Sequence, residues 1–267
     1  MRTTAVRRVG LAASAATLAL LATACGGSSD EGAEAAGTKS ETTASASAAA
    51  AEPAAAKALS AADLEKAALA QGDVEGGEVE TEVTGADDVT TDQVKTDNAA
   101  CAPLAFVQAG AAQGEPVATV KRIYEGEAEK PSGADASSED AMLAGLDAEK
   151  AVVTLASYED GGAETVFKDT KAALEKCAGG FTATALGQEL PVTKVAGTEA
   201  PKGADEAVAM TLTVTVEGGT TMPFKAVVVR KGATVASVSA ANLASAATGE
   251  DFEFPTAVLD AQLKKLG

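Results

Sequence analysis

Residues 208–216 read VAMTLTVTV, and this stretch shows the clearest two-residue alternation of apolar and polar side chains in the chain. Its Val, Met and Leu side chains fall on one side of an extended strand and its threonines on the other, which predicts one buried and one solvated face. Turn-forming residues at 217–220 (EGGT) and 231–233 (KGA) separate it from two further strand-like segments, 221–230 and 234–240. Such short turns force antiparallel pairing, so these segments predict a meander.

Helix-forming patterns flank the meander in the sequence. In residues 163–177 apolar side chains recur every three or four positions, and residues 255–266 repeat this pattern. A third helix is predicted over residues 59–71, where a serine can cap the first turn. Residues 151–158 (AVVTLASY) are typical of a buried strand. We therefore expect an α+β fold: a single domain at 59–267, with a mostly antiparallel twisted sheet and helices packed on one side.

The first thirty residues, MRTTAVRRVGLAASAATLALLATACGGSSD, carry signals for export. Arg2, Arg7 and Arg8 form a basic start, and an apolar run follows at 9–24. This run is shorter than the roughly 20 residues that a membrane-spanning helix needs, and it fits the apolar region of a secretory signal. We predict a signal peptide at residues 1–24.

Small residues precede Cys25, and a flexible Gly-Gly-Ser-Ser segment follows it. This arrangement resembles the lipobox of bacterial lipoproteins, although Ala22 stands where a leucine is usual. The resemblance implies that the thiol of Cys25 receives a diacylglycerol and becomes the mature N-terminus. Two acyl chains anchor a protein stably, whereas one holds it only marginally. The alternative is an ordinary signal peptide with an incidental Cys25, and the export route, general secretory or twin-arginine, stays open.

Residues 25–58 consist mainly of Gly, Ser, Ala, Thr and Glu, with hardly any large apolar side chain. Such a segment cannot bury enough surface to offset the entropy of ordering, so we expect a disordered tether. As a coil it spans on the order of 30 Å. The expected location is therefore the extracytoplasmic face of the cell membrane, with the lipid on Cys25 as the contact with the bilayer.

The composition excludes several functions. The net charge is −18, and removal of residues 1–24 takes away three arginines and no acids, which leaves −21. Such a chain repels nucleic acid. It contains no histidine, so neither a Ser–His nor a Cys–His dyad is present. Four aspartates lie in the segment 87–97, but they lack the spacing and central glycine of a calcium loop, which favours an acidic loop over a metal site. We expect no catalytic residue, metal or cofactor, and no enzyme.

Two cysteines remain once Cys25 is lipidated. Cys101 and Cys177 form an even pair in an oxidising compartment, which predicts a disulfide. It would join the short helix that opens near Cys101 to the end of the helix at 163–177. The alternative, a redox-active pair, lacks the CxxC spacing.

Several features, taken together, resemble the extracellular sensor domain of PknH-type receptor kinases, a family that includes stand-alone lipoprotein versions. These features are a capped helix start at Leu59-Ser60, the Cys-x-Pro at Cys101, the strand AVVTLASY, a helix with Ala163, Phe167 and Leu174 that ends in Cys177-Ala178-Gly179, and then a meander and a C-terminal helix. The resemblance implies a twisted sheet whose cleft binds an extracellular ligand. It also implies two disulfides, whereas this chain has one possible pair.

From these observations we expect a membrane-anchored extracytoplasmic lipoprotein that binds or senses an unknown ligand and does not catalyse a reaction. Its partners would be the membrane, through Cys25, and a small envelope ligand or a partner surface protein. A lipid carrier and a structural surface protein without a small-molecule site are the alternatives.

Overall fold

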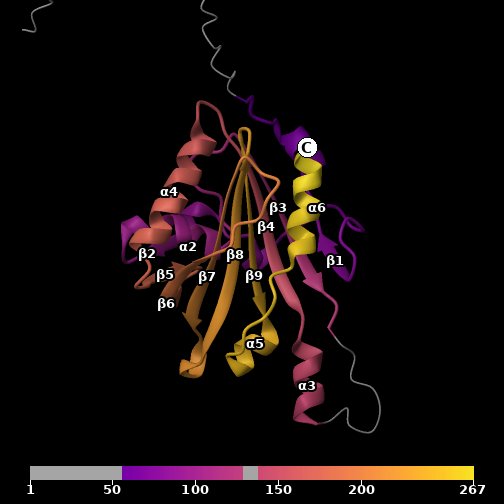
Figure 1. Ribbon diagram of the computed structural model, residues 1–267, viewed down its shortest axis with the longest axis vertical. Coiled ribbons are helices and arrows are strands. Elements are labelled where there is room, and N and C mark those ends of the chain that lie inside the picture. Colours follow the sequence, from indigo (N-terminus) through magenta and orange to yellow (C-terminus); the bar gives the residue numbers. More distant parts are fainter. Residues whose placement is uncertain (1–55, 129–137) are drawn as a thin grey trace, which may run out of the picture. The chain divides into compact units, whose positions relative to one another are not determined.

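The computed structural model of the chain describes residues 56–128 and 138–267 (Figure 1). Within these residues, nine strands form one antiparallel sheet in the order β1-β3-β4-β9-β8-β7-β6-β5-β2. The strands are β1 (Gly77–Glu80), β2 (Val94–Thr96), β3 (Ala118–Gly126), β4 (Glu149–Ser157), β5 (Phe181–Ala185), β6 (Gln188–Thr198), β7 (Glu206–Thr215), β8 (Thr221–Lys231) and β9 (Thr234–Asn242). The helices are α1 (Ala61–Ala67), α2 (Ala102–Gln108), α3 (Glu139–Leu146), α4 (Gly162–Lys176), α5 (Leu243–Thr248) and α6 (Thr256–Leu266). The predicted α+β class with an antiparallel sheet is confirmed.

The predicted signal peptide at 1–24, Cys25 and all but the last three residues of the tether at 25–58 lie outside the described residues. These assignments stay predictions. In the part of the chain that the structure describes, no helix has the length and apolar character needed to cross a membrane.

The meander at β7, β8 and β9 forms as predicted. β7 pairs with β8 over ten residue pairs, from Glu206↔Arg230 to Thr215↔Thr221, and β8 pairs with β9 from Lys225 onward. The β8–β9 turn has two residues, and the first of them, Gly232, takes φ +56°. Two-residue hairpin turns require such positive φ angles, which glycine adopts without steric cost.

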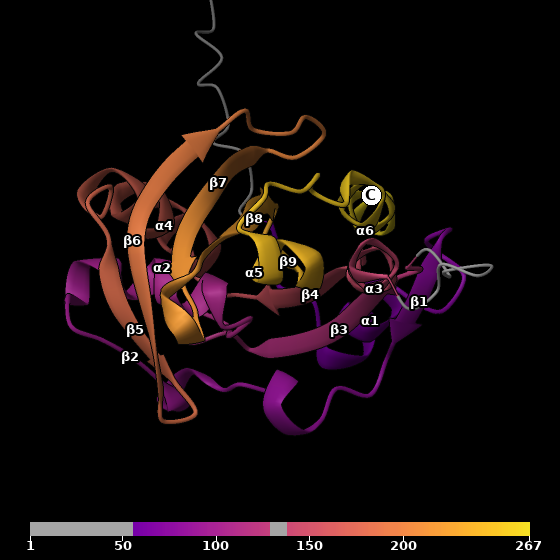
Figure 2. The ribbon, with the colours of Figure 1, turned by 90° about the horizontal axis from the view of Figure 1, so that it is seen from below.

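Helices cover both faces of the sheet, so the expectation that they pack on one side is wrong. In β8, Ala226 and Val228 belong to the core that α2 and α4 cover, whereas Val227 and Val229 belong to a second core with α1 and α6. Figure 2 shows the curved sheet from below, with α6 and the α2–α4 pair on opposite sides of β8 and β9.

The two-sided packing has its cause in the central strands. The threonine face of β7 indicated one solvated face, but β8 and β9 carry apolar side chains at consecutive positions, and most of these side chains are buried. A strand that is apolar on both faces is stable only when both faces are covered. The centre of the sheet, rather than β7, therefore determines the layers.

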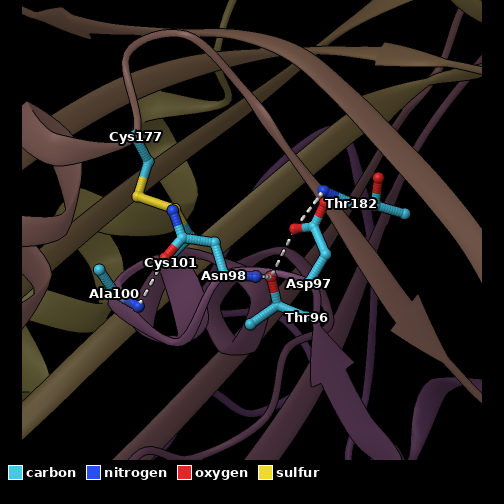
Figure 3. Close-up of a disulfide and its surroundings, with 7 residues drawn as sticks. All are labelled: Thr96, Asp97, Asn98, Ala100, Cys101, Cys177 and Thr182. Atoms are coloured by element: carbon cyan, nitrogen blue, oxygen red, sulfur yellow. Dashed lines mark hydrogen bonds between the residues drawn. A yellow bond between two sulfur atoms is a disulfide. The ribbon is translucent and has the colours of Figure 1, made fainter.

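A disulfide joins Cys101 to Cys177, with 5.8 Å between the two Cα atoms (Figure 3). It links the short 3₁₀ turn Ala99–Cys101, directly before α2, to the C-terminal end of α4. Beside it, the Asp97 carboxylate accepts a hydrogen bond from the backbone N–H of Thr182 at 2.9 Å. The disulfide and this bond attach the start of α2 to α4 and β5.

A buried glutamine joins the first and last helices. Gln262 of α6 is fully buried, accepts a hydrogen bond from the N–H of Leu69 at 3.2 Å and donates one to the carbonyl of Ala67 at 2.7 Å. Nearby, Lys265 lies 2.8 Å from the carboxylate of Asp73. The hydrogen bond from Lys265 and another from a backbone N–H lower the pKa of Asp73.

Arg122 of β3 holds the segments next to α1. The residue is only 4% exposed, and its guanidinium donates to the carbonyls of Leu69, Thr81 and Lys121 at 2.7, 3.2 and 2.8 Å. It also lies 2.5 Å from the carboxylate of Glu65. A buried cation requires such partners, because an unpaired one would carry a large desolvation cost.

Candidate functional site

A cleft of about 370 Å³ opens on the α2 side of the sheet, at the end where β8 begins and β9 ends. We call it the Ser239 cleft. β4, β8 and β9 supply its floor, the C-terminal end of α2 and the segment 86–89 supply one wall, and the β5–β6 hairpin supplies the other. The residues that line it are Ala86, Asp87, Val89, Gln108, Ala109, Lys150, Val152, Ala185, Leu186, Gln188, Leu190, Phe224, Ser239 and Ala241.

Two polar atoms in this cleft are buried without a hydrogen-bond partner. They are the hydroxyl of Ser239, whose residue is 2% exposed, and the side-chain carbonyl oxygen of Gln108. Within residues 56–128 and 138–267 no other buried side-chain nitrogen or oxygen lacks a partner. An unpaired buried polar group costs about 1–3 kcal/mol, so two in one cleft indicate a place where another molecule supplies the partners.

The end of α2 is placed by a glycine. Gly110 has φ +62°, and a Cβ atom on it would lie 2.5 Å from Cγ1 of Val152 in the cleft floor. Its carbonyl accepts a hydrogen bond from the hydroxyl of Thr154 in β4 at 2.8 Å. This close approach holds the last residue of α2, Gln108, against the floor of the cleft.

The rim of the cleft carries a strained residue. Leu186, at the tip of the β5–β6 hairpin, has φ +52° and is 45% exposed. Leu186 and Gly187 form the two-residue turn between β5 and β6, which requires positive φ angles, and a non-glycine residue in this region costs about 1–3 kcal/mol. A large apolar side chain therefore stands at the entrance where asparagine or glycine would be favoured.

The lysine at the entrance is paired with two carboxylates. Lys150 lies 2.8 Å from the carboxylate of Asp87 and 3.6 Å from that of Glu125. Burial alone would lower the pKa of Lys150, but the hydrogen bond with Asp87 and the two negative charges outweigh it and raise the pKa. The ammonium stays charged and is paired with both carboxylates, so the cleft offers no unpaired cation.

A larger groove of about 630 Å³ lies on the other face, between β7, β8 and α6. Its lining includes Val227, Phe254 and Leu259, together with Lys225, which pairs with Asp251 at 3.0 Å. Neither of the two unpartnered buried atoms of the described chain lies in it. We therefore take the Ser239 cleft as the candidate site.

Of the residues predicted from the sequence, Cys101 and Cys177 lie together in the disulfide, away from the cleft. The aspartates of segment 87–97 serve separate contacts. Asp87 pairs with Lys150, and Asp88 with Lys121 at 3.3 Å. In the described residues, no group of three or more His, Cys, Asp or Glu is placed to hold a metal ion.

The conspicuous aromatic residues Tyr158 and Phe167 lie in the core that α2 and α4 cover. The hydroxyl of Tyr158 donates to the carbonyl of Gln113 at 2.7 Å, and burial raises its pKa well above the usual value. The cavity that Tyr158 lines measures only about 10 Å³, too small for a ligand. These residues stabilise the fold.

Gln108 and Ser239 are not among the residues predicted from the sequence. The strand 234–242 reads TVASVSAAN, and its two serines share a face because they are two positions apart. Hydroxyls repeated on one face of an otherwise apolar strand were the available signal for Ser239. No comparable signal marks Gln108, which reaches the cleft only through the packing of α2 on β8 and β9.

No family model matches the chain, and no curated protein sequence matches it. Among solved structures, it is similar to the extracellular domain of PknH from Mycobacterium tuberculosis. The identity is 11%, the match covers 70% of this chain and 97% of that chain, and the TM-score is 0.31. This is a weak resemblance at the level of the fold, and the function proposed below depends on the site itself.

Proposed function

We propose that this chain is a non-catalytic, lipid-anchored extracytoplasmic protein that binds a small ligand in the Ser239 cleft. The supporting observation is that the two unpartnered buried polar atoms of the described residues, on Gln108 and Ser239, both lie in this cleft. Its volume of about 370 Å³ falls within the roughly 300–1,000 Å³ of small-molecule sites, which are mostly apolar with a few placed polar groups.

The chemistry of the lining supports binding rather than catalysis. Ser239 is the only serine among the lining residues, and no histidine exists in the chain to act as its general base. The lysine of the cleft, Lys150, is charged and paired with Asp87, so it is not a nucleophile at neutral pH. The arrangement can hold and orient a molecule but lacks a group that takes up a proton from Ser239.

A variant that fills the cleft tests this proposal. Ala241 lines the floor, so Ala241→Phe is expected to occupy the space where the ligand would lie. The full-length protein would be purified from membranes and screened by native mass spectrometry and thermal shift against envelope glycans, lipids and peptides. We expect the wild-type chain, and not Ala241→Phe, to bind. Equal responses of the two proteins across the panel would refute binding in this cleft.

An envelope lipid carrier is a second candidate function, because the groove beside α6 is larger and mainly apolar. Ala200 lines that groove and not the Ser239 cleft, so Ala200→Phe is the matched variant. A lipid that co-purifies with Ala241→Phe but not with Ala200→Phe would favour the carrier function. The opposite pattern would favour the Ser239 cleft.

The anchor proposed at Cys25 has its own test. Cys25→Ser removes the thiol that would carry the lipid, and we expect the variant to move from the membrane fraction to the soluble fraction. Two acyl chains are required for stable attachment. If Cys25→Ser remains in the membrane fraction, the anchor lies elsewhere.

A further inference from the structure

The Ser239 cleft also indicates which class of molecule it takes, an inference that rests on the proposed function. Ser239 can donate and accept a hydrogen bond, whereas the side-chain oxygen of Gln108 can only accept one. Both atoms are buried and unpartnered. With the amide oxygen of Gln108 turned into the cleft, a ligand that pairs both atoms presents an O–H or N–H group toward Gln108 and a hydrogen-bonding group toward Ser239.

The rest of the lining restricts the ligand further. Val89, Val152, Leu190 and Phe224 make most of the cleft apolar, and Leu186 adds an exposed apolar side chain at its rim. A ligand in such a site gains affinity mainly by burying its own apolar surface. Its size is small, because the cleft of about 370 Å³ is close to the lower end of the usual range of roughly 300–1,000 Å³.

Charge complementarity excludes ionic ligands. The lining residues include one cation, Lys150, and one carboxylate, Asp87, and these two are already paired at 2.8 Å. A buried anion would find no unpaired cation there, and a buried cation would lie beside the ammonium of Lys150. In both cases desolvating the ion would cost more than its contacts return. The net charge of −18 adds a long-range repulsion of anions.

We infer that the Ser239 cleft binds an uncharged, mainly apolar molecule that carries two hydrogen-bonding groups, with these groups at Gln108 and Ser239 and the apolar part against Phe224 and Leu186. An aliphatic diol has this chemistry. The hydroxyls replace the missing partners, and the alkyl chain fills the apolar lining. No covalent step is involved.

Four probes with the same chain length test this inference on the full-length protein: octane-1,2-diol, its dimethyl ether, octanoate and octylammonium. Binding would be measured by isothermal titration calorimetry, and the side-chain amide signal of Gln108 would be followed by ¹⁵N NMR. We expect the diol to bind and to shift this signal. We also expect the ether, which lacks donors, and both ions to bind at least about tenfold more weakly, since a hydrogen bond contributes about 0.5–1.5 kcal/mol and a tenfold change in affinity corresponds to about 1.4 kcal/mol.

Variants locate the contacts. Ser239→Ala and Gln108→Met are each expected to weaken diol binding about fivefold, which is the range of one hydrogen bond. Ser245→Ala is the matched control, because Ser245 is a buried serine outside the cleft. Ser239→Ala removes a hydroxyl without a partner, so the stability of the free protein to urea should not fall.

The outcomes separate this inference from the proposed function. Diol binding that neither Ser239→Ala nor Gln108→Met weakens, or tighter binding of an ionic probe, would overturn the ligand class while leaving small-molecule binding intact. If no probe shifts the Gln108 signal and the envelope panel also fails to distinguish wild type from Ala241→Phe, the proposed function itself is refuted.

Discussion

Removal of the Cys101–Cys177 disulfide should cost much of the stability of this domain. The bonded residues are 76 positions apart, and the loop-closure relation for that separation gives roughly 4.5 kcal/mol. Both cysteines are buried, so replacing each sulfur by hydrogen adds about 1 kcal/mol of lost packing. We expect Cys101→Ala to lose about 5 kcal/mol and the double alanine variant about 6 kcal/mol.

Urea unfolding of the two single variants and the double variant separates the two contributions. Each single variant already lacks the cross-link, so its cost is counted in both. The sum of the two single losses should therefore exceed the loss of the double variant by about 4–5 kcal/mol. The slope of free energy against urea should also rise, because the uncross-linked unfolded chain exposes more surface. Val107→Ala, a packing loss in α2, is the control, with a lower midpoint and an unchanged slope. Additive single losses would refute the loop-closure argument.

Three further changes test particular contacts. Lys265 and a backbone N–H lower the pKa of Asp73, so their stabilisation is present above pH 3.8 and lost as the pH falls below it. Asp73→Asn should lower the free energy of unfolding by about 1 kcal/mol at neutral pH. It should also make this free energy, measured by urea titration, depend less on pH in the acid range. Arg122→Met leaves three backbone carbonyls without their donor and should cost about 3–5 kcal/mol, read from the urea midpoint. Gly110→Ala meets Val152 and an unfavourable φ, so it should cost about 2–4 kcal/mol and alter the ¹⁵N NMR signals of the cleft. An unchanged midpoint in any of these variants would contradict the contact concerned.

Local patterns were enough to predict the meander and the main helices. The alternation in residues 208–216 marks β7, and the glycine-containing turns on its C-terminal side determine its antiparallel partners. The helix predicted over 163–177 corresponds to α4, and the one over 255–266 to α6. In each case the structural period is repeated several times within one segment, so neighbouring residues alone carry the signal.

The layers and the site depend on contacts between distant segments. β2 has only three residues and pairs with β5, roughly ninety positions later. A strand this short shows no periodic pattern from which it could be predicted. Gln108 and Ser239 lie on different elements, and both line one cleft only because α2 packs on β8 and β9. A residue pattern along one segment contains no information about which distant segments line the same cleft.

The cleft lies where α2 ends, and the lengths of the elements explain why. The seven residues of α2 rise about 10 Å, whereas the nine residues of β9 extend about 30 Å. α2 therefore covers only part of the floor, and Gly110 turns the chain away at the point where coverage stops. On this face β9 carries Val235 in the core, then the buried Ser237, and then Ser239 in the open part. Cavities that stay empty in proteins are apolar, whereas this opening carries the unpartnered polar atoms of Gln108 and Ser239, and this difference supports a binding role for it.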